Sequence, residues 1–236
     1  MTFIRAHHQR ISHILKVLDT SLLRDLNCLF GGGTAIALRY GEYRESVDID
    51  FLVSDIPSYR ELRMLVRGSS GIQAIMLPKK GESLEYGEVR SDQYGIRTKI
   101  FVNQLPIKFE IVLEGRIKLN PPSKNDHIVG VSTLTPLDMA TSKLLANSDR
   151  GMDVAAHCRD LIDLAMMNLS KLDLSKAVVK AENAYGKAVL ADLASVINLL
   201  SEREELLDHC MITMDVSVPR ALLLQRINKV RAIVDC

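Results

Sequence analysis

The sequence predicts an α+β protein, with an α/β domain over residues 1–120 and a helical domain over residues 121–236. The apolar periodicity carries this prediction, because near residue 115 it changes from mixed helix and strand patterns to helical patterns alone. Between the two parts lies KLNPPSKND (118–126), whose paired prolines and polar residues are typical of a linker. With 47% hydrophobic residues in a chain of 236, the protein can bury a substantial core.

The first domain combines helical and strand patterns. PSYRELRMLVRG (57–68) predicts a helix that begins near Pro57 and ends at Gly68. IRTKIFV and IKFEIVL are separated by residues 103–106 and predict a β-hairpin. The other elements expected in the first domain are a helix over 4–26, a short apolar run over 28–30, a short helix over 34–39 and a strand, SVDIDFLV, over 46–53.

The second domain is predicted from helix-start signals and apolar spacing. Thr135 followed by Pro136, with Asp138 in the first turn, is typical of a helix start. Further helices are expected over 154–167, 176–183, 189–209 and 219–234.

Composition limits the classes of protein to which the chain can belong. A net charge of +1 argues against a protein that coats nucleic acid by bulk electrostatics. No stretch approaches the length of an uncharged bilayer-spanning helix, and the first residues lack the apolar run of a signal peptide. A cytoplasmic location without a membrane partner is therefore expected. The side chains expected at the surface are His7, His8 and His13, and those expected as free thiols are Cys28, Cys158, Cys210 and Cys236.

Residues 60–108 carry a local excess of basic side chains. This surface could face a polyanionic substrate, or it could simply be solvated. The basic residues are Arg60, Arg63, Arg67, Lys79, Lys80, Arg90, Arg97, Lys99 and Lys108.

Two aspartates follow a run of three glycines, and together they suggest a phosphate and metal site. In a strand, Ser46, Asp48 and Asp50 share one face, which leaves two carboxylates side by side. Like charges repel, and Mg²⁺ would compensate them because it is held by one or two carboxylates plus substrate phosphates. Glycines 31–33 lack Cβ atoms, so the backbone can approach a phosphate chain, and amides leading into the next helix would point at it.

Each of these signals has other readings. A DxD pair is also used by many glycosyltransferases, and a glycine run is often only a tight turn. The glycines fit neither the P-loop nor the dinucleotide-binding pattern, so neither of those folds is supported. The combination of glycine turn, short helix and strand with two aspartates on one face is more specific.

This segment resembles the polymerase-β-like nucleotidyltransferases, and within them the AbiEii/AbiGii toxin family that includes the MenT toxins. The residues that carry the resemblance are Gly32, Gly33, Thr34, Ala35 and Ile36, followed by Arg44, Ser46, Asp48, Ile49, Asp50 and Phe51. The departures are one extra glycine and one additional residue between turn and strand. The resemblance implies a minimal nucleotidyltransferase domain with a mixed sheet and flanking helices. In it Asp48 and Asp50 bind Mg²⁺ or Mn²⁺, and the turn, with Arg44 and Ser46, holds the triphosphate of an NTP.

The superfamily usually supplies a third carboxylate from a nearby strand, and Glu110 is the candidate here. In PIKFEIVLE, Glu110 shares a face with Lys108 and Val112, whereas Phe109 and Ile111 face the other way. The alternative is an ordinary surface glutamate on a half-exposed strand.

The second half carries further motifs of the same family. LDMATSKLLANSDRG and CRDLIDLAMM resemble its lysine and arginine helix and its later aspartate motif, which implicates Lys143, Arg150, Arg159, Asp160 and Asp163. Lys143 would neutralise a triphosphate oxygen, and Asp160 would orient that lysine or the acceptor hydroxyl. On this view, replacing Lys143 by methionine would lower activity with little change in stability. The alternative is that Arg159 and Asp163 form an ordinary helical ion pair.

The resemblance implies a metal-dependent nucleotidyltransferase that acts as the toxin of a type IV-like toxin–antitoxin or abortive-infection system. It would transfer NMP from NTP to an acceptor hydroxyl, with RNA, such as a tRNA 3′ end, as acceptor and a cognate antitoxin as genetic partner. Two alternatives stay open at this point. One is a nucleotidyltransferase that modifies a small molecule such as an antibiotic, and the other is an inactive module that binds a nucleotide or an antitoxin.

Overall fold

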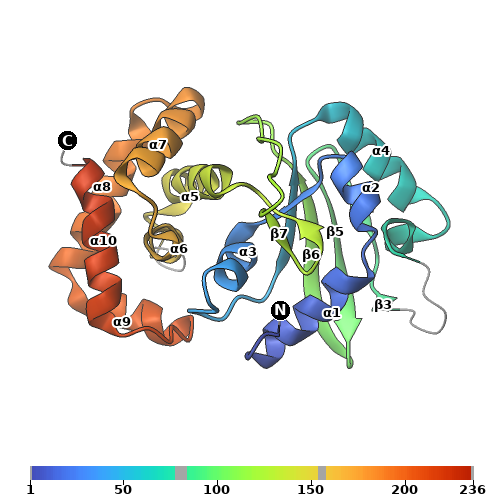
Figure 1. Ribbon diagram of the computed structural model, residues 1–236, viewed down its shortest axis with the longest axis horizontal. Coiled ribbons are helices and arrows are strands. Elements are labelled where there is room, and N and C mark those ends of the chain that lie inside the picture. The colour runs from blue at the N-terminus through green and yellow to red at the C-terminus, as the bar shows by residue number, and fades with distance from the viewer. Residues whose placement is uncertain (1, 78–83, 154–157, 235–236) are drawn as a thin grey trace. The chain divides into compact units, whose positions relative to one another are not determined.

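The computed structural model describes residues 2–77, 84–153 and 158–234 (Figure 1). They form two compact units. The first comprises the chain up to Arg39 together with Ser46–Thr135, and the second comprises Tyr40–Glu45 and the chain from Pro136 onward. The proline-rich stretch 118–126 thus belongs to the first unit, and the short segment Tyr40–Glu45 belongs to the second although both its neighbours in sequence belong to the first.

The first unit is built on a six-stranded mixed sheet with the order β1-β2-β6-β5-β3, and β4 pairs with β5 beside β3. β2 and β6 are parallel, and the other pairs are antiparallel. The strands are β1 (Leu29–Gly31), β2 (Ile49–Val53), β3 (Glu85–Tyr86), β4 (Arg90–Ser91), β5 (Gly95–Val102) and β6 (Leu105–Leu113), and a separate pair is β7 (His127–Ile128) with β8 (Val131–Ser132).

The predicted hairpin is confirmed as β5 and β6. Its two-residue turn, Asn103 and Gln104, has positive φ at both positions, the conformation that matches the twist of paired strands. Alternation along β6 buries Phe109 and Ile111 completely and leaves Glu110 half-buried on the other face. One face of the sheet is therefore apolar, and α1 and α4 pack against it (Figure 1).

The helices of the first unit are α1 (Ala6–Val17), α2 (Thr20–Asp25), α3 (Gly32–Arg39) and α4 (Ile56–Arg67), with a short 3₁₀ helix at Gly71–Ile75. The prediction of one helix over 4–26 is wrong, because Leu18 is extended and the Asp19 side chain caps a new helix through the amides of Ser21 and Leu22. α4 is confirmed, and the Asp55 side chain caps it.

The second unit is helical, as predicted (Figure 1). Its helices are α5 (Pro136–Arg150), α6 (Arg159–Met167), α7 (Lys171–Tyr185), α8 (Ala188–Glu202), α9 (Glu204–Thr213) and α10 (Arg220–Val234). The single helix expected over 189–209 is two helices, because the backbone leaves the helical conformation at Arg203. Residues 154–157 of the helix predicted over 154–167 lie outside the described residues. In the part of the chain that is described, no helix is long and apolar enough to cross a membrane.

The expectation of free thiols is wrong for two cysteines. Cys158, just before α6, and Cys210 in α9 form a disulfide, with Cα atoms 6.5 Å apart. Cys28 is free and buried, and Cys236 lies outside the described residues. The pairing could not be predicted from the sequence, since 52 residues separate partners that come together only when the helices pack.

Candidate active site

The register of the sheet brings Asp50 next to two other predicted site residues. Asp50 lies in β2 opposite Gly31 on β1 and opposite Glu110 on β6, and Asp48 immediately precedes β2. Because directly paired residues of neighbouring strands share a face, Asp50 and Glu110 lie on the same face of the sheet. Val47 is 47% exposed, and the strand begins only at Ile49, later than the predicted residue 46.

Gly32 lies directly against the carboxylate of Asp50. Its φ is +67°, and a Cβ built there would lie 2.5 Å from Asp50 Oδ2. An L-residue at this position would therefore be both strained and in contact with the carboxylate. Because α3 begins at Gly32, the first amides of this helix lie beside Asp50. A helix N-terminus with a glycine backbone is a suitable place for an anion such as a phosphate.

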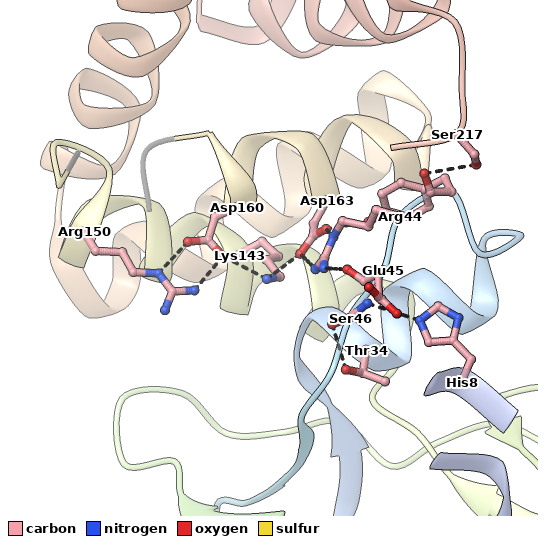
Figure 2. Close-up of polar contacts among 11 residues, drawn as sticks. His8, Thr34, Arg44, Glu45, Ser46, Lys143, Arg150, Asp160, Asp163 and Ser217 are labelled. Carbon is pink, nitrogen blue, oxygen red and sulfur yellow. Dashed lines mark hydrogen bonds and ion pairs between the residues drawn. The ribbon is translucent and has the colours of Figure 1, made fainter. Parts of the chain in front are cut away.

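Thr34, Ser46 and His8 hold the chain that precedes the aspartates. Thr34 Oγ1 donates to Ser46 Oγ over 2.8 Å, and the Ser46 amide donates to His8 Nε2 over 3.2 Å (Figure 2). The prediction that His8 lies at the surface is wrong, because its side chain is fully buried. Thr34 is buried as well, so these contacts fix the segment before Asp48.

Glu110 is paired with two cations from the same sheet face. Arg97 Nε lies 3.1 Å from Glu110 Oε1, and Lys108 Nζ lies 2.8 Å from Glu110 Oε2. Partial burial lowers the pKa of Lys108, but the hydrogen bond and charge of Glu110, with the charges of Asp48 and Asp50, raise it overall. Lys108 thus responds to the negative charge of all three carboxylates.

The donor set near Asp50 suits a hard divalent cation. It offers carboxylate oxygens, which Mg²⁺ and Mn²⁺ prefer, and two carboxylates with substrate phosphates complete a typical Mg²⁺ site. Within the described ranges, no three His, Cys, Asp or Glu side chains are grouped so that they could hold a metal by themselves. The chain therefore fits a cation that is bound together with a phosphate ligand, and Glu110 as third ligand stays a prediction.

In the second unit, α5 and α6 face each other with oppositely charged side chains. Lys143 Nζ lies 2.8 Å from Asp160 Oδ1 and 2.6 Å from Asp163 Oδ2 (Figure 2). Arg150 binds Asp160 through Nε and Nη2, at 2.7 and 2.9 Å. Lys143 and Arg150 are two turns apart on α5, and the aspartates are one turn apart on α6, so each helix presents its charges along one side.

The segment Tyr40–Glu45 supplies two more members of this cluster. Arg44 binds Asp163 through Nε and Nη2, at 2.6 and 2.8 Å, and its Nη1 donates to the Glu45 carbonyl (Figure 2). The Tyr43 hydroxyl also donates to Asp163. All three guanidinium nitrogens of Arg44 are thus engaged within the second unit, where the residue anchors the segment. Its contact with a nucleotide stays a prediction.

We call Arg44, Lys143, Arg150, Asp160 and Asp163 the ion-pair network. Burial raises the pKa of Asp160, but Lys143 and Arg150 outweigh it and lower the pKa well below its usual range. For Asp163, burial is likewise outweighed by Lys143 and Arg44, and the pKa falls. Three cations and two carboxylates leave one positive charge. The Arg150 side chain is 40% exposed and those of Lys143 and Arg44 are 7% and 3%, so Arg150 presents this charge to solvent.

Arg159, the other arginine predicted to bind the nucleotide, is exposed. Among the described residues it makes no ion pair, and the helical pair with Asp163 considered from the sequence is not formed. The reason is that Asp163 accepts from Tyr43, Arg44 and Lys143 instead. The structure therefore brings Lys143, Arg150 and Asp160 together and leaves Arg159 apart from them.

Comparison with known proteins agrees with these observations. The family described as nucleotidyl transferase AbiEii toxin, type IV TA system, matches residues 15–215. Two solved structures from Helicobacter pylori share the fold, each with a TM-score of 0.51 and each covered over 92% of its own chain. One, described as a candidate nucleotidyltransferase, is 16% identical over 97% of this chain, and the other, JHP933, is 14% identical over 99%. Comparison with curated proteins gives no match.

Proposed function

Because this chain belongs to the AbiEii toxin family of nucleotidyltransferases, we propose that it transfers a nucleoside monophosphate from an NTP to an acceptor hydroxyl, with release of pyrophosphate. In this proposal it is the toxin of a type IV toxin–antitoxin system that acts in the cytoplasm, with a cognate antitoxin as its genetic partner. Catalysis rests on positioning and on stabilisation of charge, as in other phosphoryl-type transfers.

The contact between Gly32 and Asp50 carries the proposal. It sets a carboxylate beside the first amides of α3, so that one small region offers both oxygen ligands and N–H donors. Asp48 and Asp50 would hold Mg²⁺ or Mn²⁺, which when bound neutralises the phosphates and polarises them for attack. Gly33 and the α3 amides would receive phosphate oxygens, and Thr34 and Ser46 would keep this backbone in place through their mutual hydrogen bond.

The ion-pair network supports a second role. The network has one net positive charge, and Arg150 is its most exposed cation. Arg150 would therefore bind a phosphate group. Lys143 is held between Asp160 and Asp163, so it would hold the carboxylates in position and add its charge to the field around Arg150. Asp160 would orient both cations, because each of its oxygens accepts from Arg150 and one also accepts from Lys143.

An RNA acceptor such as a tRNA 3′ end is favoured by the polar face of the sheet. Arg90 lies opposite Arg97, and Lys99 lies opposite Lys108. Cross-strand partners share a face, and the Arg97–Glu110 and Asp50–Glu110 pairs put all four cations on the face that carries Asp50. Such a basic surface suits the phosphates of a polynucleotide better than a small molecule.

One experiment tests the proposal. The protein is incubated with Mg²⁺, each α-labelled NTP in turn and total cellular RNA, alongside Asp48→Ala and a surface control, Asp25→Ala. We expect label on a discrete RNA and equimolar pyrophosphate, lost in Asp48→Ala and kept in the control. Label on an added aminoglycoside instead of RNA would indicate the small-molecule reading, and absence of pyrophosphate with every acceptor would indicate an inactive module.

A further inference from the structure

Asp48 lies just outside the sheet that holds its partner carboxylate. Asp50 is within β2 and is paired on both sides, to Gly31 and to Glu110. The four residues before β2, which include Asp48, have irregular backbone. Strand pairing therefore fixes Asp50 directly, whereas the direction of the Asp48 side chain depends on whatever holds the chain before the strand.

Two adjacent histidines at the start of α1 hold successive backbone groups of this segment. His8 Nε2 accepts from the Ser46 amide over 3.2 Å (Figure 2). His7 Nε2 lies 3.0 Å from the carbonyl oxygen of Val47. That carbonyl belongs to the planar peptide unit that also contains the Asp48 nitrogen. A contact with it therefore restrains the backbone of Asp48 itself.

The partners of the two rings determine which nitrogens are protonated. A carbonyl oxygen only accepts, so His7 Nε2 carries a proton, and His7 Nδ1 accepts from Arg10 Nη2 over 3.1 Å. A backbone amide only donates, so His8 Nε2 carries no proton and the ring proton is on Nδ1. Turning either ring over would set carbon atoms against these partners. His7 and His8 are thus neutral rings in opposite tautomers.

α1 gives the two rings a rigid base. The helix packs against β5 of the sheet, and its buried side chains include Ile11, Ile14 and Leu15. His8 is fully buried and His7 is half-buried. Movement of the segment before Asp48 would therefore break a contact with a helix that is fixed in the core.

We propose that His7 and His8 are positioning residues, which direct the Asp48 carboxylate toward a bound cation without touching the cation themselves. The proposal rests on the proposed function, because Asp48 is a metal ligand there. Groups that orient metal ligands typically change the metal affinity about 10-fold to 100-fold when they are replaced. Asp50 needs no such support, because strand pairing holds it.

The tautomers can be tested without metal or nucleotide. Protein with ¹⁵N-labelled histidine is studied by long-range ¹H–¹⁵N correlation at neutral pH, and the two ring signals are assigned by their loss in His7→Gln and His8→Gln. We expect the Nε2–H pattern for His7 and the Nδ1–H pattern for His8. The same tautomer in both rings, or averaging between tautomers in either ring, would overturn the proposal.

Cation binding separates positioning from a structural role. The probe is Mn²⁺ with inorganic tripolyphosphate, and its binding is measured by water proton relaxation. We expect His7→Leu and His8→Leu to bind the probe about tenfold more weakly than wild type. The two glutamine variants should recover most of this affinity, because an amide can replace ring Nε2 as donor or acceptor. His13→Leu, at a half-buried histidine of the same helix, is the matched control and should bind like wild type.

Urea unfolding of the same variants shows whether the fold is kept, and half-buried His7 keeps the test available if His8→Leu does not fold. Unchanged affinity in the leucine variants, or a loss that glutamine does not recover, would overturn the proposal. If Asp48→Ala binds the probe as tightly as wild type, this inference and the metal assignment of the proposed function both fail. Binding that depends on Asp48, His7 and His8 in a protein that transfers no nucleotide would keep this inference and defeat the proposed function.

Discussion

The two aspartate pairs of the molecule have similar sequences and different environments. Asp48 and Asp50 are half-exposed at the start of β2, with Lys108 near them. Asp160 and Asp163 are buried, and together they accept from Lys143, Arg150 and Arg44. The first pair is half-exposed and lies near one lysine, whereas the second is buried and neutralised by three cationic side chains. The spacing of aspartates in the sequence therefore identifies carboxylates that lie on one side of an element. The cations around them determine whether they suit a metal ion or join helices through ion pairs.

The comparison predicts its largest effect for Asp50→Ala. Transfer should be abolished, because a proposed metal ligand is lost, whereas the free energy of unfolding should be unchanged or should rise as repulsion between the two carboxylates is relieved. Asp48→Ala should behave alike. Activity assays and urea unfolding of both variants check this. Wild-type turnover in either variant would remove the basis for the metal assignment.

Lys143→Met should destabilise the protein, unlike the expectation from sequence alone. The lysine is buried between two carboxylates, so its loss should lower the free energy of unfolding by roughly 3 kcal/mol. The value stands at the low end for a broken buried pair, because Asp160 keeps Arg150 and Asp163 keeps Arg44. Lys187→Met, at an exposed lysine, is the control and should change stability by less than about 0.5 kcal/mol. Equal urea midpoints in the two variants would contradict a structural role for the network.

Reduction of the Cys158–Cys210 disulfide should loosen the same region. Cys158 immediately precedes α6, which carries Asp160 and Asp163. The disulfide closes a loop of 52 residues, and opening it should lower the free energy of unfolding by at most about 4 kcal/mol. Measured losses for such bonds are commonly about 2–4 kcal/mol. Urea unfolding with and without reductant measures the loss, with Cys210→Ser as the variant that should no longer respond. A midpoint indifferent to reductant would count against the bond.

Acid should reduce the contribution of Asp160 and Asp163 to the stability of the protein. The folded pKa values of Asp160 and Asp163 lie below their unfolded value near 4. Their contribution is therefore complete above about pH 4 and is lost as the pH falls through the depressed folded values. Between pH 5 and pH 2.5, the stability of wild type should fall more steeply than that of Asp163→Asn. Parallel curves of stability against pH for the two proteins would show that ionised Asp163 does not stabilise the fold.

The smallest expected effect is that of Gly32→Ala. A positive φ costs an L-residue roughly 1–2 kcal/mol, and the added Cβ would displace the Asp50 carboxylate. We expect weaker nucleotide binding together with this modest loss of stability. Gly115→Ala, at an open position without a positive φ, is the control. Equal nucleotide affinity in both variants would show that the contact between Gly32 and Asp50 has no bearing on binding.

The parts of the fold and site that local patterns determine were predictable. Alternation separates Asp50 and Glu110 from the apolar residues of their own strands, and the hairpin follows from two apolar runs with a short gap. The contact of Arg44 with Asp163 was not predictable, because 119 residues separate them and only the packed second unit brings them together. His8 was missed for the same reason, since a histidine on an amphipathic helix carries no sign of a distant partner.

The assignment of Tyr40–Glu45 to the second unit has a consequence for the order in which the chain matures on the ribosome. Arg44 is translated 119 residues before Asp163. At bacterial or eukaryotic elongation rates of 5–20 residues per second, Asp163 is translated roughly 6–24 seconds after Arg44. During that interval Arg44 lacks its carboxylate partner, although His8 and Thr34 can already hold Ser46. A chain that is released early therefore keeps Asp48 and Asp50 and lacks Asp163, the partner of Arg44, so that the ion-pair network is incomplete until α6 is made.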